Sequence, residues 1–274
     1  MTTPAVYLHQ IAYSPQSLAA VEPGYAVLDN LVNPRPDWFE YWPLRHYLLQ
    51  HTLDDSAFYG FFSTKFGVKT NLQHADVVRT VQTHAPQADV VLFCPQPDMG
   101  AFFLNVFEQG ELFDAGLIDG FEAFLRHVGQ PVALRTLVMD SRQVVFSNYF
   151  VARPAFWRAW LARCEQFFDV CEGPPGAMRD ALVSPTTYPG AVQRKVFLLE
   201  RMASLMLALE PRWRVHAANP FRCAWSMTRF REQPTEAVIS DALKVAYREQ
   251  PFPEYLAAFA HIRRMFKAPP AAAA

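Results

Sequence analysis

The sequence lacks an excess of charge of either sign. Among its 274 residues, 25 lysines and arginines nearly balance 26 aspartates and glutamates. Nucleic-acid binding needs a concentrated positive surface that neutralises phosphates, so we do not expect nucleic acid as a partner. Lysine itself is scarce, since the chain holds five lysines against twenty arginines.

Long apolar runs and paired cysteines are also missing. No stretch approaches the roughly 20 apolar residues of a transmembrane helix, so we expect no transmembrane segment. The first residues, MTTPAVYLHQIAYS, show no signal-peptide pattern. Cys94, Cys164, Cys171 and Cys223 are scattered and form no C-x-x-C pair. This spacing predicts free, buried thiols in a reducing cytosol rather than disulfides or a zinc site.

Several catalytic signatures do not occur. The chain contains no G-x-x-x-x-G-K-[ST], G-x-G-x-x-G, G-x-S-x-G or H-E-x-x-H pattern, and its eight histidines form no pair at ligand spacing. These absences argue against P-loop nucleotide hydrolysis, Rossmann dehydrogenase chemistry, serine hydrolysis and zinc peptidase activity. Asp-x-Asp, a pattern that would favour a metal site, is missing as well.

The apolar and aromatic content predicts a folded chain. Hydrophobic residues make up 51% of the sequence, with 23 Phe, 10 Tyr and 6 Trp, which is enough for one sizeable core. Short aromatic or β-branched runs alternate with longer helical patterns. This alternation predicts an α/β fold with a mostly parallel central sheet flanked by helices. We expect strands at residues 6–13, 57–63, 88–94, 144–152 and 213–217.

The helical patterns lie between and after these strands. We expect helices at 38–51, capped by Asp37 with Pro43 near the first turn, at 72–84, capped by Asn71, and from Pro154 to 168. Further helices are expected within 95–113, as one long helix at 189–209, and at 236–249 and 253–266. The proline-rich segment 23–36 is expected to be a loop. This pattern predicts one α/β domain at 1–218, a C-terminal helical extension at 219–267, and a frayed tail at 268–274.

Candidate ligand-binding residues follow the expected strands, because ligands of open α/β sheets bind beyond the carboxyl ends of the strands. The segment AFYGFFSTKFGVKT places Ser63, Lys65 and Lys69 after the second strand. Lysine is a compact charge that suits phosphate oxygens, so the two lysines could hold a diphosphate. The alternative is that both are solvated loop residues.

The third strand is followed by Gln96 and Asp98, within a Pro-x-Pro frame. Asp98 could bind a divalent cation, Mg²⁺ or Mn²⁺, which prefer oxygen ligands, or it could accept hydrogen bonds from sugar hydroxyls. The alternative role for Asp98 is to cap a helix that starts at Met99. The missing Asp-x-Asp weighs against the metal.

Asp140 and Glu200 are candidate general bases. Asp140 lies beside Arg142, shortly before Asn148, so the alternative is a surface ion pair. Glu200 is adjacent to Arg201 inside the expected long helix, where it lies either on the polar face or buried against arginine. A buried carboxylate needs a partner and is often functional. Arg194 precedes it on the same helix.

Four segments resemble a bacterial glycosyltransferase-like family from cell-surface polysaccharide loci, long described as a domain of unknown function. They are FEYWPLRHYLL with FYGFFSTKF, ADVVLFCPQPD with NVFEQGELF, FSNYFVARPAFWRAWL, and QRKVFLLERMASLML. They span roughly residues 10–218. The resemblance implies a GT-A-type fold, which binds nucleotide sugars, and a cytoplasmic protein that is either free or peripheral to the inner membrane.

The same resemblance implies a reaction. A sugar would pass from a nucleotide-sugar donor to a glycan acceptor, with Lys65, Lys69, Arg142 and Arg194 stabilising the departing diphosphate. Asp140 is the first choice for the base and Glu200 the second, while Asp98 would bind the metal or donor hydroxyls. Ser63, Gln96 and Asn148 would contact the donor, and Tyr59, Phe62 and Tyr149 could stack on rings or pack in the core. The alternative is a non-catalytic glycan-binding or scaffolding module. The oligomeric state stays open.

Overall fold

Short apolar runs rich in valine, phenylalanine and tyrosine form the strands of a single sheet. The computed structural model describes residues 3–190 and 192–265. Within them the sheet has six strands: β1 (Val6–Ala12), β2 (Ala26–Asp29), β3 (Phe58–Ser63), β4 (Val90–Leu92), β5 (Phe150–Ala152) and β6 (Val215–Ala217). The expected positions of β1, β3, β4 and β6 are confirmed within two residues at either end, whereas the strand expected at 144–152 forms only at Phe150–Ala152.

The strand order is β2-β1-β3-β5-β4-β6, and the sheet is mostly parallel. β1 pairs in parallel with β2 and β3, and β4 pairs in parallel with β6. β5 runs antiparallel between β3 and β4, with Tyr59 opposite Ala152 and Leu92 opposite Phe150. The carboxyl ends of the five parallel strands and the amino end of β5 therefore share one edge of the sheet. This confirms an α/β fold with a mostly parallel sheet.

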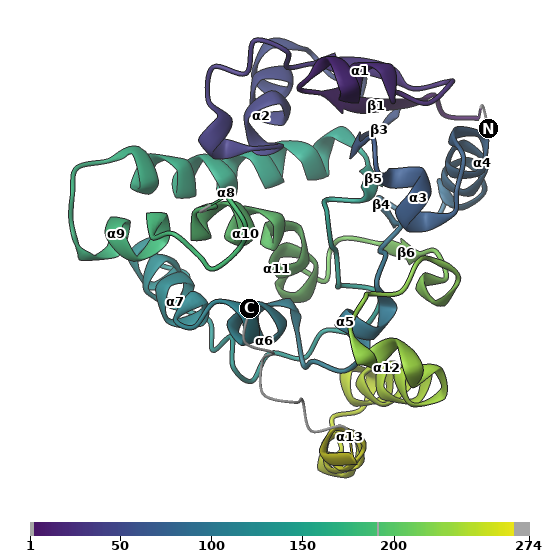
Figure 1. Ribbon diagram of the computed structural model, residues 1–274. Coiled ribbons are helices and arrows are strands. Elements are labelled where there is room, and N and C mark those ends of the chain that lie inside the picture. The colour runs from purple at the N-terminus through teal and green to yellow at the C-terminus, as the bar shows by residue number, and fades with distance from the viewer. Residues whose placement is uncertain (1–2, 191, 266–274) are drawn as a thin grey trace.

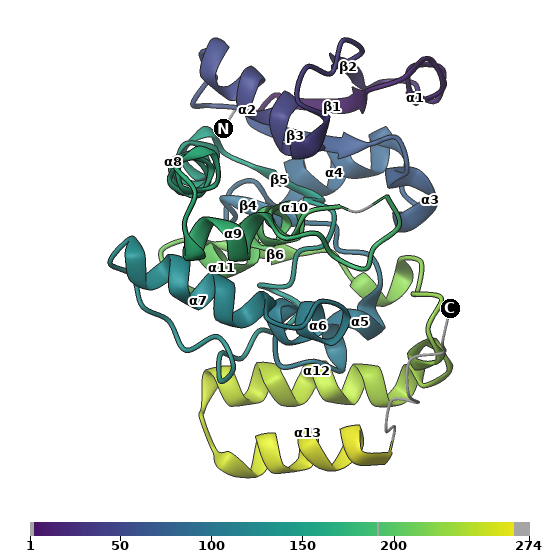
Figure 2. The same ribbon diagram turned by 60° about the vertical axis from the view of Figure 1, so that its left-hand side comes forward.

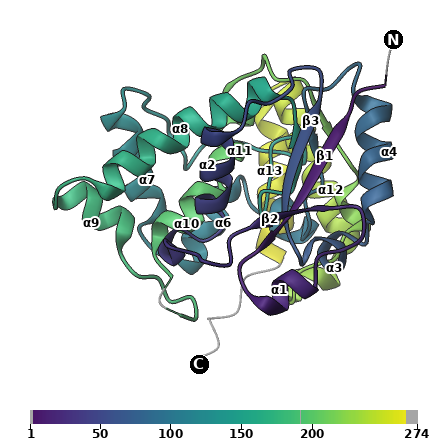
Figure 3. The same cartoon turned by 90° about the horizontal axis from the view of Figure 1, so that it is seen from above.

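Helices cover both faces of the sheet. Seen from above, α4 lies on one side of β1 and β3, whereas α2, α8 and α11 lie on the other (Figure 3). The helices up to β6 are α1 (Pro15–Ala19), α2 (Tyr41–Gln50), α3 (Phe66–Thr70), α4 (His74–His84), α5 (Pro97–Ala101), α6 (Val106–Phe113), α7 (Leu117–His127), α8 (Pro154–Glu172), α9 (Ala177–Val183), α10 (Arg194–Glu200) and α11 (Met202–Leu209).

The alternation of side chains along the strands divides the core in two. Phe58 and Phe62 of β3 pack with Phe66, Val77 and Val81 on the face covered by α3 and α4. The side chain of Phe61, also on β3, points to the opposite face of the sheet. It belongs to a larger cluster that includes residues of α8 and α11. Each Å² of apolar surface that is buried stabilises the fold by about 25 cal/mol. The two clusters together therefore supply most of the driving force for folding.

The last two helices, α12 (Pro234–Glu249) and α13 (Pro253–Met265), form an antiparallel pair beside α5 and α6 (Figures 1 and 2). Fully buried Lys244 donates hydrogen bonds to the carbonyls of Gly100 (2.7 Å) and Phe103 (2.9 Å), and Arg263 pairs with Glu108 at 2.7 Å. The helical extension is thus fixed to the sheet's own helices. The tail expected at 268–274 lies outside the described residues.

Three local expectations were wrong. The segment expected as a loop at 23–36 contains β2, an edge strand held by its parallel pairing with β1. The helix expected at 189–209 is interrupted at Arg201, whose N–H bonds to the carbonyl of Leu198 three residues back (3.1 Å), and so two helices form. Asn71 is the left-handed C-cap of α3, and a Gln73–Asp76 capping box starts α4 instead.

Other expectations on helix starts and thiols can be compared directly. Pro43 lies in the first turn of α2 and Pro154 begins α8, as expected. Asp37 lies in a short 3₁₀ turn and pairs with Arg35 and Lys195 rather than capping α2. All four cysteines are buried and unpaired, which confirms the expectation of free thiols. Across residues 3–190 and 192–265, no helix combines the length and the apolar character needed to cross a membrane.

Candidate functional site

The polar centre of the sheet edge lies where β3 ends and β5 begins. Ser63 is the last residue of β3, and Tyr149 directly precedes β5. Because the two strands are antiparallel neighbours, these residues meet, and the Ser63 hydroxyl lies 2.6 Å from the Tyr149 hydroxyl. The short helix α3 follows β3 and brings two lysines to the same edge (Figure 1).

The two lysines of this segment have different surroundings. Lys65, just before α3, is exposed. Lys69, in the last turn of α3, is partly buried; its Nζ donates to the Ser147 hydroxyl at 3.0 Å and lies 5.5 Å from the centre of the Tyr149 ring. Lys69 therefore points toward the segment before β5, whereas Lys65 lies at the surface.

The segment before β5, whose Ser147 accepts the hydrogen bond from Lys69, has an unusual backbone. Ser147 and Asn148 are consecutive left-handed residues, with φ of 57° and 52°. Residues other than glycine seldom adopt this conformation, and it recurs where a structure holds side chains for function. The Asn148 side chain is buried, and its Oδ1 has no hydrogen-bond partner among the described residues. A buried acceptor without a partner is costly in free energy, which makes this atom a candidate ligand contact.

Glu40, which the sequence did not single out, joins this edge from the start of α2. It follows Phe39, whose left-handed backbone (φ 47°, ψ −130°) is a further strained position, and whose side chain is exposed. Burial and, to a smaller extent, the neighbouring Glu200 raise the pKa of Glu40 to about 8 against the opposing charges of Lys69 and Lys65. Glu40 therefore keeps its proton at neutral pH.

Glu200 is the last residue of α10 and lies next to the buried Arg201. Burial raises its pKa above the ordinary range, while the charges of Arg201 and Lys69 lower it. Arg201 itself donates to the carbonyls of Val106 (2.8 Å) and Phe197 (2.7 Å). The guanidinium is thus fixed in place and supplies a constant positive field beside Glu200.

Lys69 is the group that ties these charges together. It acts electrostatically on both Glu40 and Glu200, and Lys65 acts on Glu40. We call these four residues the lysine–carboxylate cluster. Arg201 and Lys69 favour the ionised form of Glu200, and Lys69 and Lys65 favour that of Glu40, but the ionised form of Glu40 is also opposed by Glu200. Two carboxyl groups whose environments separate their pKa values are suited to act as a base and an acid.

The space beyond the carboxyl end of β4, by contrast, is occupied by the segment around Ser226 and Thr228. Asp98 is fully buried, and its carboxylate accepts hydrogen bonds from the Ser226 N–H (3.0 Å), the Ser226 hydroxyl (2.5 Å) and the Thr228 hydroxyl (3.4 Å). Gln96 is left-handed and donates its N–H to the carbonyl of Ala224 at 2.8 Å. The cavity beside it measures about 20 Å³, which suits a water molecule rather than a sugar.

These contacts do not fit a metal ligand at Asp98, because both carboxylate oxygens already accept hydrogen bonds from the 226–228 segment. Among the residues that the structure describes, no group of three or more His, Cys, Asp and Glu side chains is arranged to hold a metal ion. Asp98 instead anchors the segment that leads to α12.

Asp140 and Arg142 form a structural ion-pair network. The Arg142 guanidinium donates to both oxygens of the fully buried Asp140, at 3.0 and 2.8 Å, and also to Glu249 of α12 at 2.7 Å. Arg248 adds a second cation 3.5 Å from Asp140. Both oxygens of the Asp140 carboxylate are thus occupied by arginine contacts, so we no longer assign Asp140 the role of base.

Arg194 is also neutralised. It pairs with Asp114 through two contacts, at 2.6 and 2.8 Å, and donates to the carbonyls of Ala115 and Ala181. Neither Arg142 nor Arg194 thus offers a free cation to an anionic ligand. Tyr59 and Phe62 are buried core residues. Of the expected site residues, the structure brings together Ser63, Lys65, Lys69, Asn148 and Glu200, with Tyr149 at their centre.

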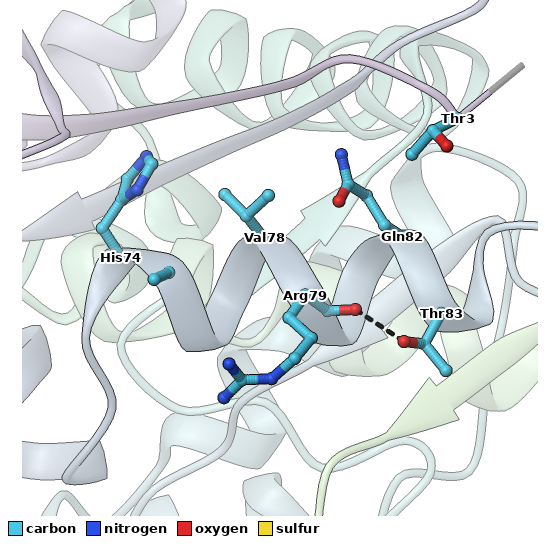
Figure 4. A pocket seen from close by; sticks show the side chains of 7 residues that line it. Thr3, His74, Val78, Arg79, Gln82 and Thr83 are labelled. Carbon is cyan, nitrogen blue, oxygen red and sulfur yellow. Dashed lines mark hydrogen bonds between the residues drawn. The ribbon is translucent and has the colours of Figure 1, made fainter.

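A hollow on the surface of α4 lies apart from these residues. It measures about 600 Å³ and is lined by short side chains and by His74, Arg79 and Gln82 (Figure 4). Within it the Thr83 hydroxyl donates to the Arg79 carbonyl at 2.8 Å, a bond internal to the helix. None of the expected site residues lines this hollow.

Comparison of the chain with protein-family models, curated proteins and solved structures gives no significant match.

Proposed function

We propose that the chain is a glycosyltransferase that moves a sugar from a nucleotide-sugar donor to a glycan acceptor at the lysine–carboxylate cluster. The observation that carries the proposal is the position of Lys69, a partly buried cation whose charge acts on both Glu40 and Glu200 at the carboxyl edge of a mostly parallel sheet. That edge is where ligands of open α/β sheets bind.

The lysines supply the charge that departure of a diphosphate requires. When the bond between a sugar and a nucleoside diphosphate breaks, negative charge develops on the phosphate oxygens, and cations fixed beforehand stabilise it. Lys69 is held by Ser147 and the Tyr149 ring, so its position costs little reorganisation at the moment of reaction. Exposed Lys65 adds a second charge from the same helix.

The two carboxyl groups divide the proton chemistry. Glu200, whose pKa is raised by burial and held back by the charges of Arg201 and Lys69, accepts the proton of the acceptor hydroxyl as that oxygen attacks the sugar. Glu40, which keeps its proton up to about pH 8, places no second negative charge beside the diphosphate. This assignment keeps Glu200 as the base and leaves Asp140 to the ion-pair network.

Neighbouring polar groups can orient the sugar. The unpartnered Oδ1 of Asn148 accepts hydrogen bonds, and sugar hydroxyls donate them. The hydroxyls of Ser63 and Ser147 lie on the same segment pair. These groups suit a polyhydroxylated substrate better than an apolar one.

The first test is binding. A panel of nucleoside diphosphates, each with and without Mn²⁺, is added to the protein and the melting temperature is measured. We expect at least one diphosphate to raise it, and the Lys69→Met and Lys65→Met exchanges to reduce the rise. Arg264→Met, which removes an exposed cation of α13, serves as the matched control and should retain the full effect.

The second test is turnover. Each nucleotide sugar is incubated with the protein and candidate glycan acceptors, and the release of nucleoside diphosphate is measured. Glu200→Gln should reduce release by about 10²-fold or more, because the base is lost, whereas Glu254→Gln on α13 should not. A protein that binds a diphosphate or a glycan but releases no diphosphate from any donor would be a non-catalytic module, and that outcome overturns the proposal.

A further inference from the structure

A second hollow lies between α2 and the edge of the sheet formed by β1 and β2. It measures about 550 Å³, within the range of about 300–1,000 Å³ that is usual for ligand pockets. One wall is β2 with the loop that follows it, and the other is formed by Trp42, His46 and Tyr47 of α2 and by His51. We call it the β2–α2 groove.

The floor of the groove carries a buried polar atom without a partner. His9 is only 8% exposed, and its Nδ1 forms no hydrogen bond with the described residues. Its ring is held on two sides, stacked on Phe61 (centroids 5.0 Å apart) and edge-on to Tyr47 (4.9 Å). The ring therefore cannot turn away to find another partner.

The charge state of His9 sets what its Nδ1 can bind. Burial lowers the pKa of His9 to about 4, a hydrogen bond with the Gly60 backbone partly opposes this, and His51 lowers it further. The ring is therefore neutral at physiological pH. A neutral imidazole has one donor and one acceptor nitrogen, so the unpartnered Nδ1 can form a hydrogen bond with a ligand hydroxyl, which both donates and accepts.

The remaining lining combines aromatic faces with uncharged polar groups. Tyr47 and His51 stack with their ring centres 4.2 Å apart and form one wall. The amides of Asn30 and Asn33 come from the loop after β2, and Val32, 91% exposed, forms the rim. No lysine or arginine is among the described residues that line the groove, and Asp29 supplies its one carboxylate.

We propose that the β2–α2 groove binds a neutral carbohydrate. A sugar ring offers several hydroxyl groups to His9, Asp29 and the asparagine amides, and it presents C–H groups to the aromatic wall. A phosphate or other anion is disfavoured, because the lining supplies a carboxylate and no fixed cation.

This binding goes beyond the proposed transfer reaction, since it needs neither a donor nor turnover. The two sites nevertheless share α2, which begins directly after Glu40 and carries Trp42, Tyr47 and the groove wall. A glycan held in the groove lies along the helix whose first turn reaches the lysine–carboxylate cluster. In a transferase, the groove is thus placed to hold part of the acceptor.

The test is saturation-transfer NMR with neutral mono- and disaccharides, on the full chain, in the absence of any nucleotide. Two variants probe the groove. His9→Phe keeps the stacked ring and removes the unpartnered nitrogen, and Val32→Trp fills the rim from a position that is 91% exposed. Val238→Trp, at a 45% exposed valine of α12, is the matched control.

We expect at least one neutral sugar to receive saturation from the wild-type protein and from Val238→Trp. Val32→Trp should abolish the signal, and His9→Phe should weaken the sugar's affinity about fivefold to tenfold, the loss of one buried hydrogen bond. The proposal is overturned if no neutral sugar binds, or if Val32→Trp binds as well as the control. Diphosphate binding at Lys69 can succeed or fail independently of these results.

Discussion

Replacing Glu40 by glutamine should stabilise the protein in alkaline solution and leave it unchanged in acid. Glutamine resembles the protonated carboxyl group and cannot ionise. The pKa of Glu40 rises from 4.5 to about 8 on folding. Below pH 4.5 both the folded and the unfolded chain hold the proton, so wild type and variant should differ little.

The sign of the effect follows from proton binding. Between pH 4.5 and 8 the folded protein keeps a proton that the unfolded chain has released, so the stability of the wild type falls as the pH rises through this window. The pKa difference of about 3.5 corresponds to about 5 kcal/mol at about 1.4 kcal/mol per pKa unit. Glu40 is partly exposed, and solvent screening reduces this to an expected gain of about 2 kcal/mol for the variant above pH 8.

The assay is thermal unfolding at pH 5 and pH 9. With an unfolding entropy of about 2.1 cal/mol/K per residue, a gain of about 2 kcal/mol raises the melting temperature by about 4 °C. Glu254→Gln, at an exposed glutamate of α13, is the control and should show the same small difference at both pH values. If Glu40→Gln also shows equal differences at pH 5 and pH 9, Glu40 is not held protonated by its surroundings, and the division of roles between the two carboxyl groups fails.

Three further predictions concern the frame around the site. Asp98→Ala should lower the free energy of unfolding by about 2–3 kcal/mol, measured by urea titration, because buried groups of Ser226 lose their acceptor; a loss below about 0.5 kcal/mol would refute this. A double-mutant cycle on the free energy of unfolding with Ser63→Ala and Tyr149→Phe should give a coupling energy of about 1 kcal/mol. If the two losses of stability simply add, the hydrogen bond between these hydroxyls is refuted. Burial lowers the pKa of Lys244 to about 8, so the stability of the wild type relative to Lys244→Met should rise with pH from 8 to 10.5. A stability difference that does not change over this range would contradict the lowered pKa of Lys244.

The sequence predicted the sheet well where its signal was local. Runs such as FYGFFS and VVL have the β-branched and aromatic residues of buried strands, and Pro154 marks the start of α8 in the manner typical of helix N-termini. β2 was missed because four residues between prolines carry little signal of their own. Its stability comes from pairing with β1, which sequence periodicity does not show.

Part of the candidate site could be selected from the sequence for the same reason. Ser63, Lys65 and Lys69 follow a recognisable strand, so the rule about carboxyl ends selected them as candidates. Glu40 was missed because the segment WFEYWP predicts the start of a helix, in which one polar residue is unremarkable. The only indication of a special role was a single carboxylate between aromatic residues. Nothing local in the sequence indicates that it would meet Lys69.

The residues whose charges are paired within the protein show the converse problem. Asp98, Asp140 and the two arginines occupy loop and helix-end positions that suit a binding site. Two of their partners, Ser226 for Asp98 and Glu249 for Arg142, are more than 100 residues away in the chain. Whether a charged side chain is free or neutralised depends on such distant partners, and sequence spacing does not reveal them.

The central claim, that Lys69 holds two carboxyl groups in one electrostatic unit, is tested most directly by ¹³C NMR titration of glutamate side chains in the wild type and Lys69→Met. The Glu40 carboxyl should titrate near pH 8 in the wild type and at higher pH in the variant, because a cation that favours its ionised form is gone. A Glu40 signal that titrates between pH 4 and 5 in both proteins would contradict the claim.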